Sequence, residues 1–556
     1  MLAGIGTAMA VPAIATASPG EDSGSDRPSV SGRHSIGRDA AARGGTQSRP
    51  SPGGESSTAH RQVSRRAAAI GRADTVLATS APPTVPVRGG AADRGAAPSA
   101  ATTVASTVAA APTPNAAEPA PTPVATAAAA KAPGPIKAAV VAAQAYIYGY
   151  PLMEYQRVRQ TVGTVNTLYS LESFANPDLD PIWLSIGGGK RPNVDTFYSL
   201  AELDLSNGPV VLSIPDMGSR YFSFQLTDPY TNASAYIGSR TTGSGPGRYA
   251  ITWVGGPQVD LGPDVQTVLV PYASMLALGR TLAGDAADQQ QAIGLMQQYS
   301  LDPSGGTVSP IIPIPKPGLG YLDAISAAME LNPPPPIDAP QLAAMAEIGV
   351  GPGLRVEDAN LSLLSRLAAG LAVQATAALL PLLTTVNQYA SALQNRGWAT
   401  PDAAIGNYGT DYLLRAGVAE VGLLANTPDE AVYSAGLLSR NLLPLGGLGS
   451  YVLHFAPGEE PPVGAFWSVT VYDNSGNLVP NAAKQYDVSS SRPDELVRRP
   501  DGSIDIIFSP RDPGDPGANW LKTPFVGGFN AYLRMYVPDQ SVLDGTWTAP
   551  AIVRHR

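Results

Sequence analysis

The sequence contains no cysteine, and that absence alone excludes several kinds of site. Disulfide bonds, thiolate nucleophiles and cysteine-ligated zinc or iron–sulfur centres all need a residue that the chain lacks. Histidine is almost as scarce, with only His34, His60, His454 and His555. Of these, only His454 lies inside the aromatic-containing part of the chain and away from its end. A histidine-rich metal site is therefore excluded, and we predict neither a metal nor a cofactor.

Aromatic residues are missing from the first 145 positions. All 37 of them (22 Tyr, 6 Trp and 9 Phe) lie at or beyond Tyr146. A segment without aromatics buries too little apolar area to offset its loss of conformational entropy. We therefore predict that residues 18–134, which are rich in Ala, Pro and Ser, form a disordered tether in front of one folded body.

The first 17 residues have the composition of a secretory leader. Residues 2–15 (LAGIGTAMAVPAIA) are an apolar run, and Ala15-Thr16-Ala17 offers the small residues that signal peptidase accepts. The run is too short to stay in a bilayer as an anchor. Basic residues in front of it are missing, which a start site assigned too late would explain; a merely Ala-rich N-terminus is the alternative. We expect a signal peptide at 1–17 and a secreted or cell-envelope protein without a transmembrane anchor.

Positive charge is in short supply in the predicted folded body. Residues 135–556 hold 24 Lys+Arg and 37 Asp+Glu, a net charge of −13, whereas residues 18–134 hold 12 and 8. An acidic surface is repelled by phosphate backbones. We therefore exclude nucleic acid as a partner.

The pattern of apolar residues predicts an α+β protein in three parts. Period-two alternation predicts strands at 209–214, 220–226 and 248–254, and later at 451–455, 466–472, 503–508 and 531–537. Spacings of three and four predict helices at 136–160, 286–300, 320–331, 340–348, 361–396 and 412–424, with Pro151 and Pro381 breaking two of them. These elements predict a β-rich N-terminal domain (135–300), a helical middle (301–440) and a C-terminal antiparallel β-sandwich of jelly-roll type (441–556).

Alternation also predicts which polar side chains share a strand face. Tyr532, Arg534 and Tyr536 fall on one face of the last strand, where two phenols and a guanidinium can line a cavity or pair with a carboxylate. In the first β region, Asp195 and Asp228 are the candidate catalytic carboxylates, because two such groups in one cleft have their pKa values driven apart. The alternative is that both aspartates cap turns.

Two further motifs have ordinary interpretations. His454 alternates with Val452 on a strand, so a buried, hydrogen-bonded histidine is favoured over a hydrolase base. The glycine run at 187–189 before Lys190 lacks the spacing and the Ser or Thr of a phosphate-binding loop, so a flexible loop is favoured.

Several motifs in a fixed order resemble a known pair of domains. Residues 145–151 (AYIYGYP), 192–198 (PNVDTFY), 203–206 (LDLS) and 278–281 (LGRT), with Arg220, Tyr221, Asp228, Thr231 and Asn232, resemble the domain of unknown function 1254. Residues 462–473 (PVGAFWSVTVYD), 501–503 (DGS), 519–521 (NWL) and 544–547 (DGTW), with Asn481 and Arg534, are similar to the domain of unknown function 1214. The resemblance implies a two-domain α+β architecture ending in a jelly roll, and it implies no particular activity.

The residues left for chemistry are Asp, Tyr, Arg and Asn. We expect a polar small molecule or a glycan to be bound by residues from both β regions. Chemical processing of this ligand and homo-oligomerisation are left open. The expected ligand-binding residues are Asn193, Tyr198, Arg220, Tyr221, Asn232, Arg280, Asn519, Trp520 and Arg534. The alternative is a non-catalytic interaction or structural protein displayed on the tether. An exposed apolar patch would favour this alternative, whereas a concave pocket would favour ligand binding.

Overall fold

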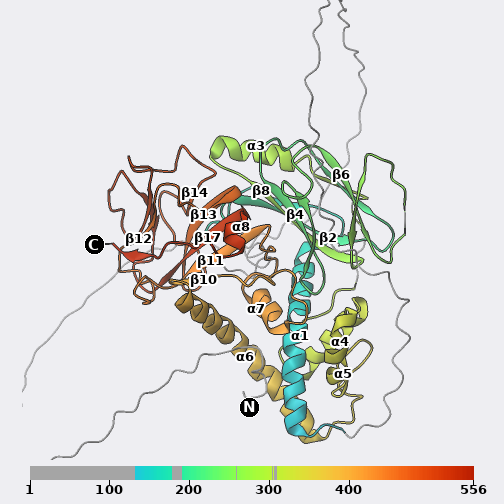
Figure 1. Cartoon of the computed structure of the whole chain (residues 1–556). Coiled ribbons are helices and arrows are strands. Elements are labelled where there is room, and N and C mark those ends of the chain that lie inside the picture. The colour runs from blue at the N-terminus through green and yellow to red at the C-terminus, as the bar shows by residue number, and fades with distance from the viewer. Residues whose placement is uncertain (1–131, 178–190, 258, 304, 306–309, 556) are drawn as a thin grey trace, which may run out of the picture. The chain divides into compact units, whose positions relative to one another are not determined.

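A computed structural model describes residues 132–177, 191–257, 259–303, 305 and 310–555 (Figure 1). The predicted leader, nearly all of the predicted tether and the glycine run at 187–189 lie outside these residues, as does Lys190. The described residues form a mixed α+β fold, with sheets in the N-terminal and C-terminal parts and helices between them, as the sequence predicted.

The N-terminal part holds two sheets that enclose a shared core. The first has the strand order β1-β2-β8-β4-β5 and the second the order β7-β6-β3-β9. The strands are β1 (Tyr169–Leu171), β2 (Thr196–Asp204), β3 (Val210–Ile214), β4 (Phe222–Thr227), β5 (Ala233–Gly238), β6 (Gly247–Trp253), β7 (Gln266–Val270), β8 (Ser274–Leu282) and β9 (Ser300–Asp302). Phe222 and Phe224 of β4 face the core together with Leu212 of β3 and Ile251 of β6. The opposite face of the first sheet, with Tyr221 and Gln225, is thereby left for other partners.

Helices cover part of that opposite face. α1 (Pro135–Val162) packs Tyr155 and Val158 against Leu200 of β2 and Leu278 of β8. The other helices are α3 (Ala286–Met296), α4 (Leu319–Leu331), α5 (Ala339–Ala346), α6 (Leu363–Gln394), α7 (Tyr412–Gly422) and α8 (Gln540–Leu543), with a 3-10 turn η1 at Pro336–Asp338.

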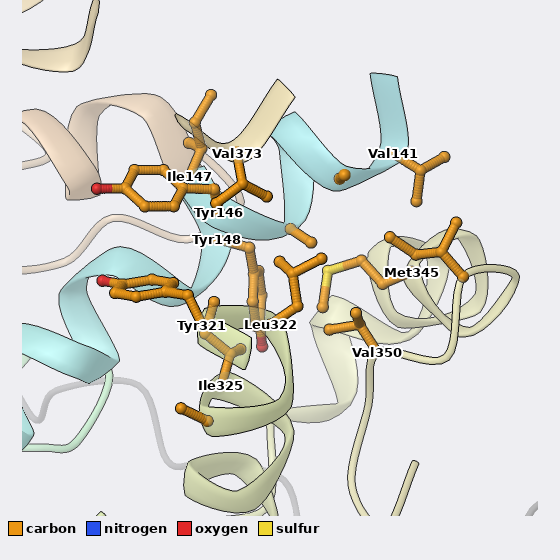
Figure 2. Close-up of a cluster of buried hydrophobic side chains, with 14 of the residues drawn as sticks. Val141, Tyr146, Ile147, Tyr148, Tyr321, Leu322, Ile325, Met345, Val350 and Val373 are labelled. Carbon is orange, nitrogen blue, oxygen red and sulfur yellow. The ribbon is translucent and has the colours of Figure 1, made fainter. Parts of the chain in front are cut away.

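The first half of α1 forms a second core with α4, α5 and α6 (Figure 2). The predicted break at Pro151 is wrong, because α1 runs on through it. Proline removes one hydrogen bond of the helix, and the packing of α1 against its neighbours offsets that loss. Gly149 has a separate reason to be glycine: a Cβ there would lie 2.4 Å from Ile325 of α4, so glycine permits the close approach of the two helices.

α6 likewise runs through Pro381, which contradicts the predicted division of this helix. It extends from the start of α1, where the Ser365 hydroxyl donates to the carbonyl of Pro133 at 3.0 Å, towards the C-terminal sheets (Figure 1). Its length and mean hydropathy are sufficient for a membrane span. Only 17 % of its most apolar stretch of 18 residues is buried.

The C-terminal part is a sandwich of two sheets with the orders β10-β11-β17-β13-β14 and β16-β15-β12-β18. The strands are β10 (Trp398–Ala399), β11 (Ala431–Gly436), β12 (Tyr451–Phe455), β13 (Val463–Asp473), β14 (Asp487–Ser489), β15 (Ile504–Ser509), β16 (Asn519–Lys522), β17 (Phe529–Pro538) and β18 (Val553–Arg554). Leu453, Trp467, Ile506 and Leu533 meet in the core between the sheets.

Two details of this sandwich differ from the prediction. β15 and β16 pair in parallel, so the sandwich is not antiparallel throughout. β10 and β11 precede residue 441 and still belong to this sandwich, because β11 pairs with β17. Both strands fall in the segment where helices were expected. The jelly-roll type stays a prediction.

Candidate functional site

The first sheet of the N-terminal part and the β11–β17–β13 sheet turn polar faces towards each other. The rings of Tyr221 and Tyr536 meet edge to face with centroids 5.4 Å apart, and the Asn193 amide donates to the Tyr536 hydroxyl. The Ser468 hydroxyl donates to Asp195 Oδ2 at 2.7 Å. Strands far apart in sequence therefore contribute to one buried region. We call it the polar layer and define it by the following residues: Asn193, Asp195, Tyr198, Tyr221, Ser223, Gln225, Arg280, Asn426, Tyr433, Ser468, Thr470, Asp487, Arg534 and Tyr536.

Each sheet places the same row of three side chains on this face. In the first sheet the strand register aligns Tyr198 of β2, Arg280 of β8 and Ser223 of β4. In the second sheet it aligns Tyr433 of β11, Arg534 of β17 and Ser468 of β13. Directly opposed residues on neighbouring strands point to the same side of a sheet. Both sheets therefore present a guanidinium flanked by a phenol and a hydroxyl.

The two arginines of these rows are buried, and all of their partners are neutral. Arg280 donates to Gln225 Oε1 at 3.0 Å, to Asn426 Oδ1 at 2.9 Å and to the Leu424 carbonyl at 2.8 Å. It is 5 % exposed. In the described part of the chain, no carboxylate lies within ion-pair distance of it.

Arg534 is 4 % exposed and has the same character. It donates to Thr470 Oγ1 at 3.0 Å, to the Tyr472 hydroxyl at 2.7 Å and to the Arg191 carbonyl at 3.1 Å. It too has no ion-paired carboxylate among the described residues. The expectation that Arg534 lines a shared face with phenols is thus met, whereas the alternative of a carboxylate partner is not. The charge of Asp195 acts on Arg534 and favours its cationic form, but without a direct ion pair. A buried cation that lacks a directly paired anion is costly, and a bound anion can supply that partner.

The phenols of the polar layer stay protonated and so remain hydrogen-bond donors. Burial raises the pKa of Tyr198, and the positive charges of Arg280 and then Arg534 oppose that rise. Burial also raises the pKa of Tyr433 and of Tyr536. Because both arginines act on Tyr198, the two guanidinium groups both lie near this phenol.

Asp195 is buried in the polar layer next to a second carboxylate, Asp487. Asp195 is 0 % exposed, and its Oδ1 has no hydrogen-bond partner. Asp487 lies opposite Thr470 in the β13–β14 register and so on the face that carries Ser468, the hydroxyl donor to Asp195. Arg492 pairs with Asp487 Oδ2 at 2.7 Å.

The environment of Asp487 favours its protonated form. Burial raises its pKa to about 7, and the charge of Asp195 adds to this rise, although Arg492 opposes it. A proton on Asp487 lets the two carboxyl groups lie side by side, since two ionised carboxylates in one buried place repel each other. Asp487 was not among the predicted residues, because its three-residue strand gave no sequence signal.

Asp228, the other predicted catalytic carboxylate, lies apart from this pair. Asp195 precedes Thr196, which pairs with Leu282 at one end of β8, and Asp228 follows Thr227, which pairs with Leu276. Six residues of β8 separate these positions, or about 20 Å at the rise of a strand. The two aspartates therefore do not share a cleft.

The contacts of Asp228 are those of a turn cap. Its Oδ1 accepts from the backbone nitrogens of Tyr230 at 2.8 Å and Asn232 at 2.9 Å, and its Oδ2 accepts from the Asn232 amide at 3.0 Å. Burial raises its pKa to about 6, although the hydrogen bonds from Asn232 lower it. This is the capping alternative from the sequence. Asn232 takes part in this cap and also lines one of the cavities described below, so ligand binding by Asn232 stays a prediction.

The other predicted residues outside the layer make local structural contacts. Arg220 forms an ion pair with Asp288, with an Nη2–Oδ1 distance of 2.5 Å. The Asn519 amide donates to the carbonyls of Val497 and Asp505, and the Trp520 indole donates to the Ser509 carbonyl at 3.1 Å. Nothing in these contacts tests ligand binding, which for these residues stays a prediction.

His454 is exposed, not buried as predicted. Its side chain is 51 % exposed and pairs through Nδ1 with Asp505 Oδ1 at 2.6 Å. It lies on β12, whose alternate residues Leu453 and Phe455 face the core of the C-terminal sandwich. A histidine on the outer face of the sandwich is not placed to serve the polar layer.

Two cavities lie at the margins of the polar layer. One, of about 480 Å³, is lined by β5, by the predicted residue Asn232, and by Gly406, Asn407, Thr427 and Asp429. Tyr236 joins it to the layer, because the Tyr236 hydroxyl lies 3.5 Å from Asn426 Oδ1, the acceptor of Arg280.

The other cavity, of about 310 Å³, is lined by Arg191, Thr385, Gln388, Glu420 and Asn474 among others. Arg191 joins this cavity to the layer, because its carbonyl accepts from Arg534 and its guanidinium lies 5.4 Å from the centre of the Tyr532 ring. Both volumes fall within or near the usual range of small-molecule sites. Among the described residues, no group of three or more Asp, Glu or His side chains is placed to hold a metal ion.

Two family models match this chain, one in its N-terminal part and one in its C-terminal part. Residues 165–303 match DUF1254 and residues 430–540 match DUF1214, each described as a protein of unknown function. These are the domains that the motifs resembled, in the predicted order. The comparison with curated proteins finds no match.

Solved structures of two bacterial proteins are similar to this chain. The VPA0106 protein from Vibrio parahaemolyticus has a TM-score of 0.55 and 22 % identity, over 75 % of this chain and 100 % of its own. An uncharacterised protein from Burkholderia cenocepacia has a TM-score of 0.38 and 14 % identity, over 73 % of this chain and 87 % of its own. The first similarity supports the fold.

Proposed function

Starting from a chain whose residues 165–303 match DUF1254 and whose residues 430–540 match DUF1214, we propose that the polar layer between these segments binds a small anionic, hydroxylated molecule. One observation carries this proposal: Arg280 and Arg534 are buried in the layer with neutral partners only. A carboxylate bound between them would supply the direct ion pair that neither arginine has, and guanidinium groups match its geometry.

The remaining groups of the layer suit the rest of such a molecule. The phenols of Tyr198, Tyr433 and Tyr536 can donate to hydroxyl or carboxylate oxygens, while the Gln225 and Asn426 side chains offer both donors and acceptors. Aromatic rings also pack well against the apolar faces of sugar rings. A sugar acid or a hydroxylated dicarboxylate therefore fits this chemistry better than a neutral apolar ligand does.

The proposal is binding, without a chemical step. Asp195 is engaged by Ser468, and Asp487 is held by Arg492, so both carboxyl groups have structural partners. The leader-like residues 1–17 and the Ala/Pro/Ser-rich residues that follow support a place outside the cytoplasm, in the cell envelope or secreted.

A panel of small molecules tests the binding proposal. We expect sugar acids and hydroxylated dicarboxylates to raise the melting temperature of the full chain, and neutral sugars to leave it unchanged. Arg280→Gln and Arg534→Gln should each weaken the affinity for the best compound about 10- to 100-fold, the usual worth of a hydrogen bond to a charged group. Calorimetric titration measures the loss.

Arg499→Gln is the matched control for this panel. Arg499 belongs to the same domain as Arg534, but it is ion-paired with Asp505 and Asp515 at the surface of the sandwich. It should keep the affinity of the unaltered chain. Equal binding of charged and neutral compounds, or equal affinities in all three variants, would refute the proposed anion site.

A further inference from the structure

α6 buries mostly small residues and exposes large apolar ones, which is the reverse of an ordinary amphipathic helix. Its buried positions are mostly small, with Ser365, Ala369 and Ala392 at 1 %, 0 % and 0 % exposure. Eight of its nine leucines point outward, from Leu363 at 82 % exposed to Leu383 at 37 %, and Leu380 is buried at 1 %. A helix that packs on a core normally buries its large apolar side chains. α6 therefore has a second apolar face that the described part of the chain leaves uncovered.

This outward face is a continuous stripe along the helix. We define the α6 stripe as Leu363, Leu364, Leu367, Leu371, Leu379, Leu382, Leu383, Val386 and Leu393. Exposed Ala375 and Ala378 fill the gap in its middle. The spacings of three and four residues are those of the seam between two packed helices. From Leu363 to Leu393 the stripe covers 30 residues of rise, or about 45 Å.

We propose that the α6 stripe pairs with the α6 stripe of a second copy of this chain. The size of the stripe fits: a standard interface buries about 800 Å² on each partner, and nine aliphatic side chains, each at least 37 % exposed, offer apolar area of that order. Exposed apolar patches this large are rare on monomers and mark interaction sites.

The charges of the region favour a second copy as the partner. Between Arg366 and Arg396 the chain has no charged residue, so two identical stripes meet without repulsion. A two-fold dimer requires a self-complementary surface of this kind. The proposal is independent of the polar layer, since the stripe residues contribute nothing to it.

A lipid surface fits the same region less well. Helices that lie in a membrane interface carry Lys or Arg on the polar face and commonly Trp or Phe on the apolar face. α6 has neither Trp nor Phe, and Arg366 is its only basic residue. The net charge of −13 on residues 135–556 also opposes binding to anionic lipid. The other face of α6 is packed against α1, so lipid could not surround this helix on all sides.

Light scattering of the full chain tests the pairing. We expect a dimer at micromolar concentration, and we expect the double variant Leu371→Glu/Leu382→Glu to be a monomer with unchanged circular dichroism. The control is Leu269→Glu on β7, where a leucine that is 52 % exposed lies outside α6; this variant should remain a dimer. An unaltered chain that is monomeric up to 100-fold higher concentration would overturn the proposal, and so would a double variant that stays dimeric.

Cross-linking gives a second, independent readout, because the chain has no cysteine of its own. Leu379→Cys places one thiol at the middle of the stripe, where two crossing helices bring like residues within disulfide reach. It should form a covalent dimer under mild oxidation, whereas Leu269→Cys should not. Equal cross-linking of both variants would contradict a specific interface. Flotation of a monomeric chain with phosphatidylcholine vesicles would assign the stripe to lipid instead.

Discussion

Arg159→Met should lower the free energy of unfolding by about 3–5 kcal/mol, the usual cost of removing one partner of a buried ion pair. Arg159 on α1 and Glu202 on β2 are each 1 % exposed, and the Arg159 Nη2–Glu202 Oε1 distance is 2.5 Å. Without Arg159, Glu202 must either stay ionised in the core or take up a proton. Burial already raises the pKa of Glu202, and Arg159 is what opposes the rise.

Two control variants separate this ion pair from general effects on the helix. Arg157→Met lies two residues away on α1 and removes the half-exposed Arg157 from its pair with Glu154, whose side chain is 10 % exposed. Burial raises the pKa of Glu154 to about 7, so Glu154 can take up a proton and the loss should be smaller than in Arg159→Met. The double variant Arg159→Met/Glu202→Met should recover much of the loss, since it leaves no buried charge unpaired. Urea unfolding of the four proteins measures the differences. Similar losses in Arg157→Met and Arg159→Met would contradict the assigned role of the buried pair.

Asp487→Asn should change how stability depends on pH. An unfolded aspartate has a pKa of about 3.9, whereas Asp487 in the fold has a pKa of about 7. Between these values the folded chain binds more protons than the unfolded chain, so this group lowers stability as the pH rises from 4 to 7. The effect is complete above pH 7 and amounts to a few kcal/mol. Asp487→Asn removes it, so the variant should gain stability relative to the unaltered chain over this range.

Asp288→Asn is the control with the opposite sign. The hydrogen bond from Arg220 lowers the pKa of Asp288, so its contribution to stability is present above the unfolded pKa and is lost only as the pH falls below it. The loss in Asp288→Asn should therefore stay constant from pH 5 to 8, while the difference for Asp487→Asn changes over the same range. Chemical denaturation at several pH values compares them. A flat difference for Asp487→Asn would show that the residue does not hold a proton in the fold.

The sequence predicted half of the polar layer and missed the other half for physical reasons. Arg534 and Tyr536 could be assigned to one face because β17 is ten residues long and alternates clearly. Tyr433 could not, because β11 is a short strand rich in Ala, Ser and Gly, and its pairing with β17 determines its conformation. Tyr198 and Arg280 were candidates from the motifs that contain them, and no strand was predicted at either position. Which face they share becomes known from the β2–β8 register.

The errors concern residues whose role depends on distant partners. Asp195 and Asp228 look alike in sequence, each beside a turn, yet one meets Ser468 from 273 positions away and the other caps its own turn. Proline usually breaks or kinks a helix. At Pro151 and Pro381 the helices continue, because packing against neighbouring elements offsets the local effect of the proline. Composition and period predicted the class of fold, whereas register and long-range packing determined the site.

The strand order of the C-terminal sandwich has a consequence for biosynthesis. β17 is the central strand of its sheet and lies between β11 and β13, although it spans only residues 529–538 near the end of the sequence. Until β17 leaves the ribosome, β11 and β13 have no neighbour on that side and keep unpaired backbone edges. The row that contains Arg534 is therefore among the last parts to form, and a nascent chain stalled before residue 529 would hold Tyr433 and Ser468 without the strand that joins them.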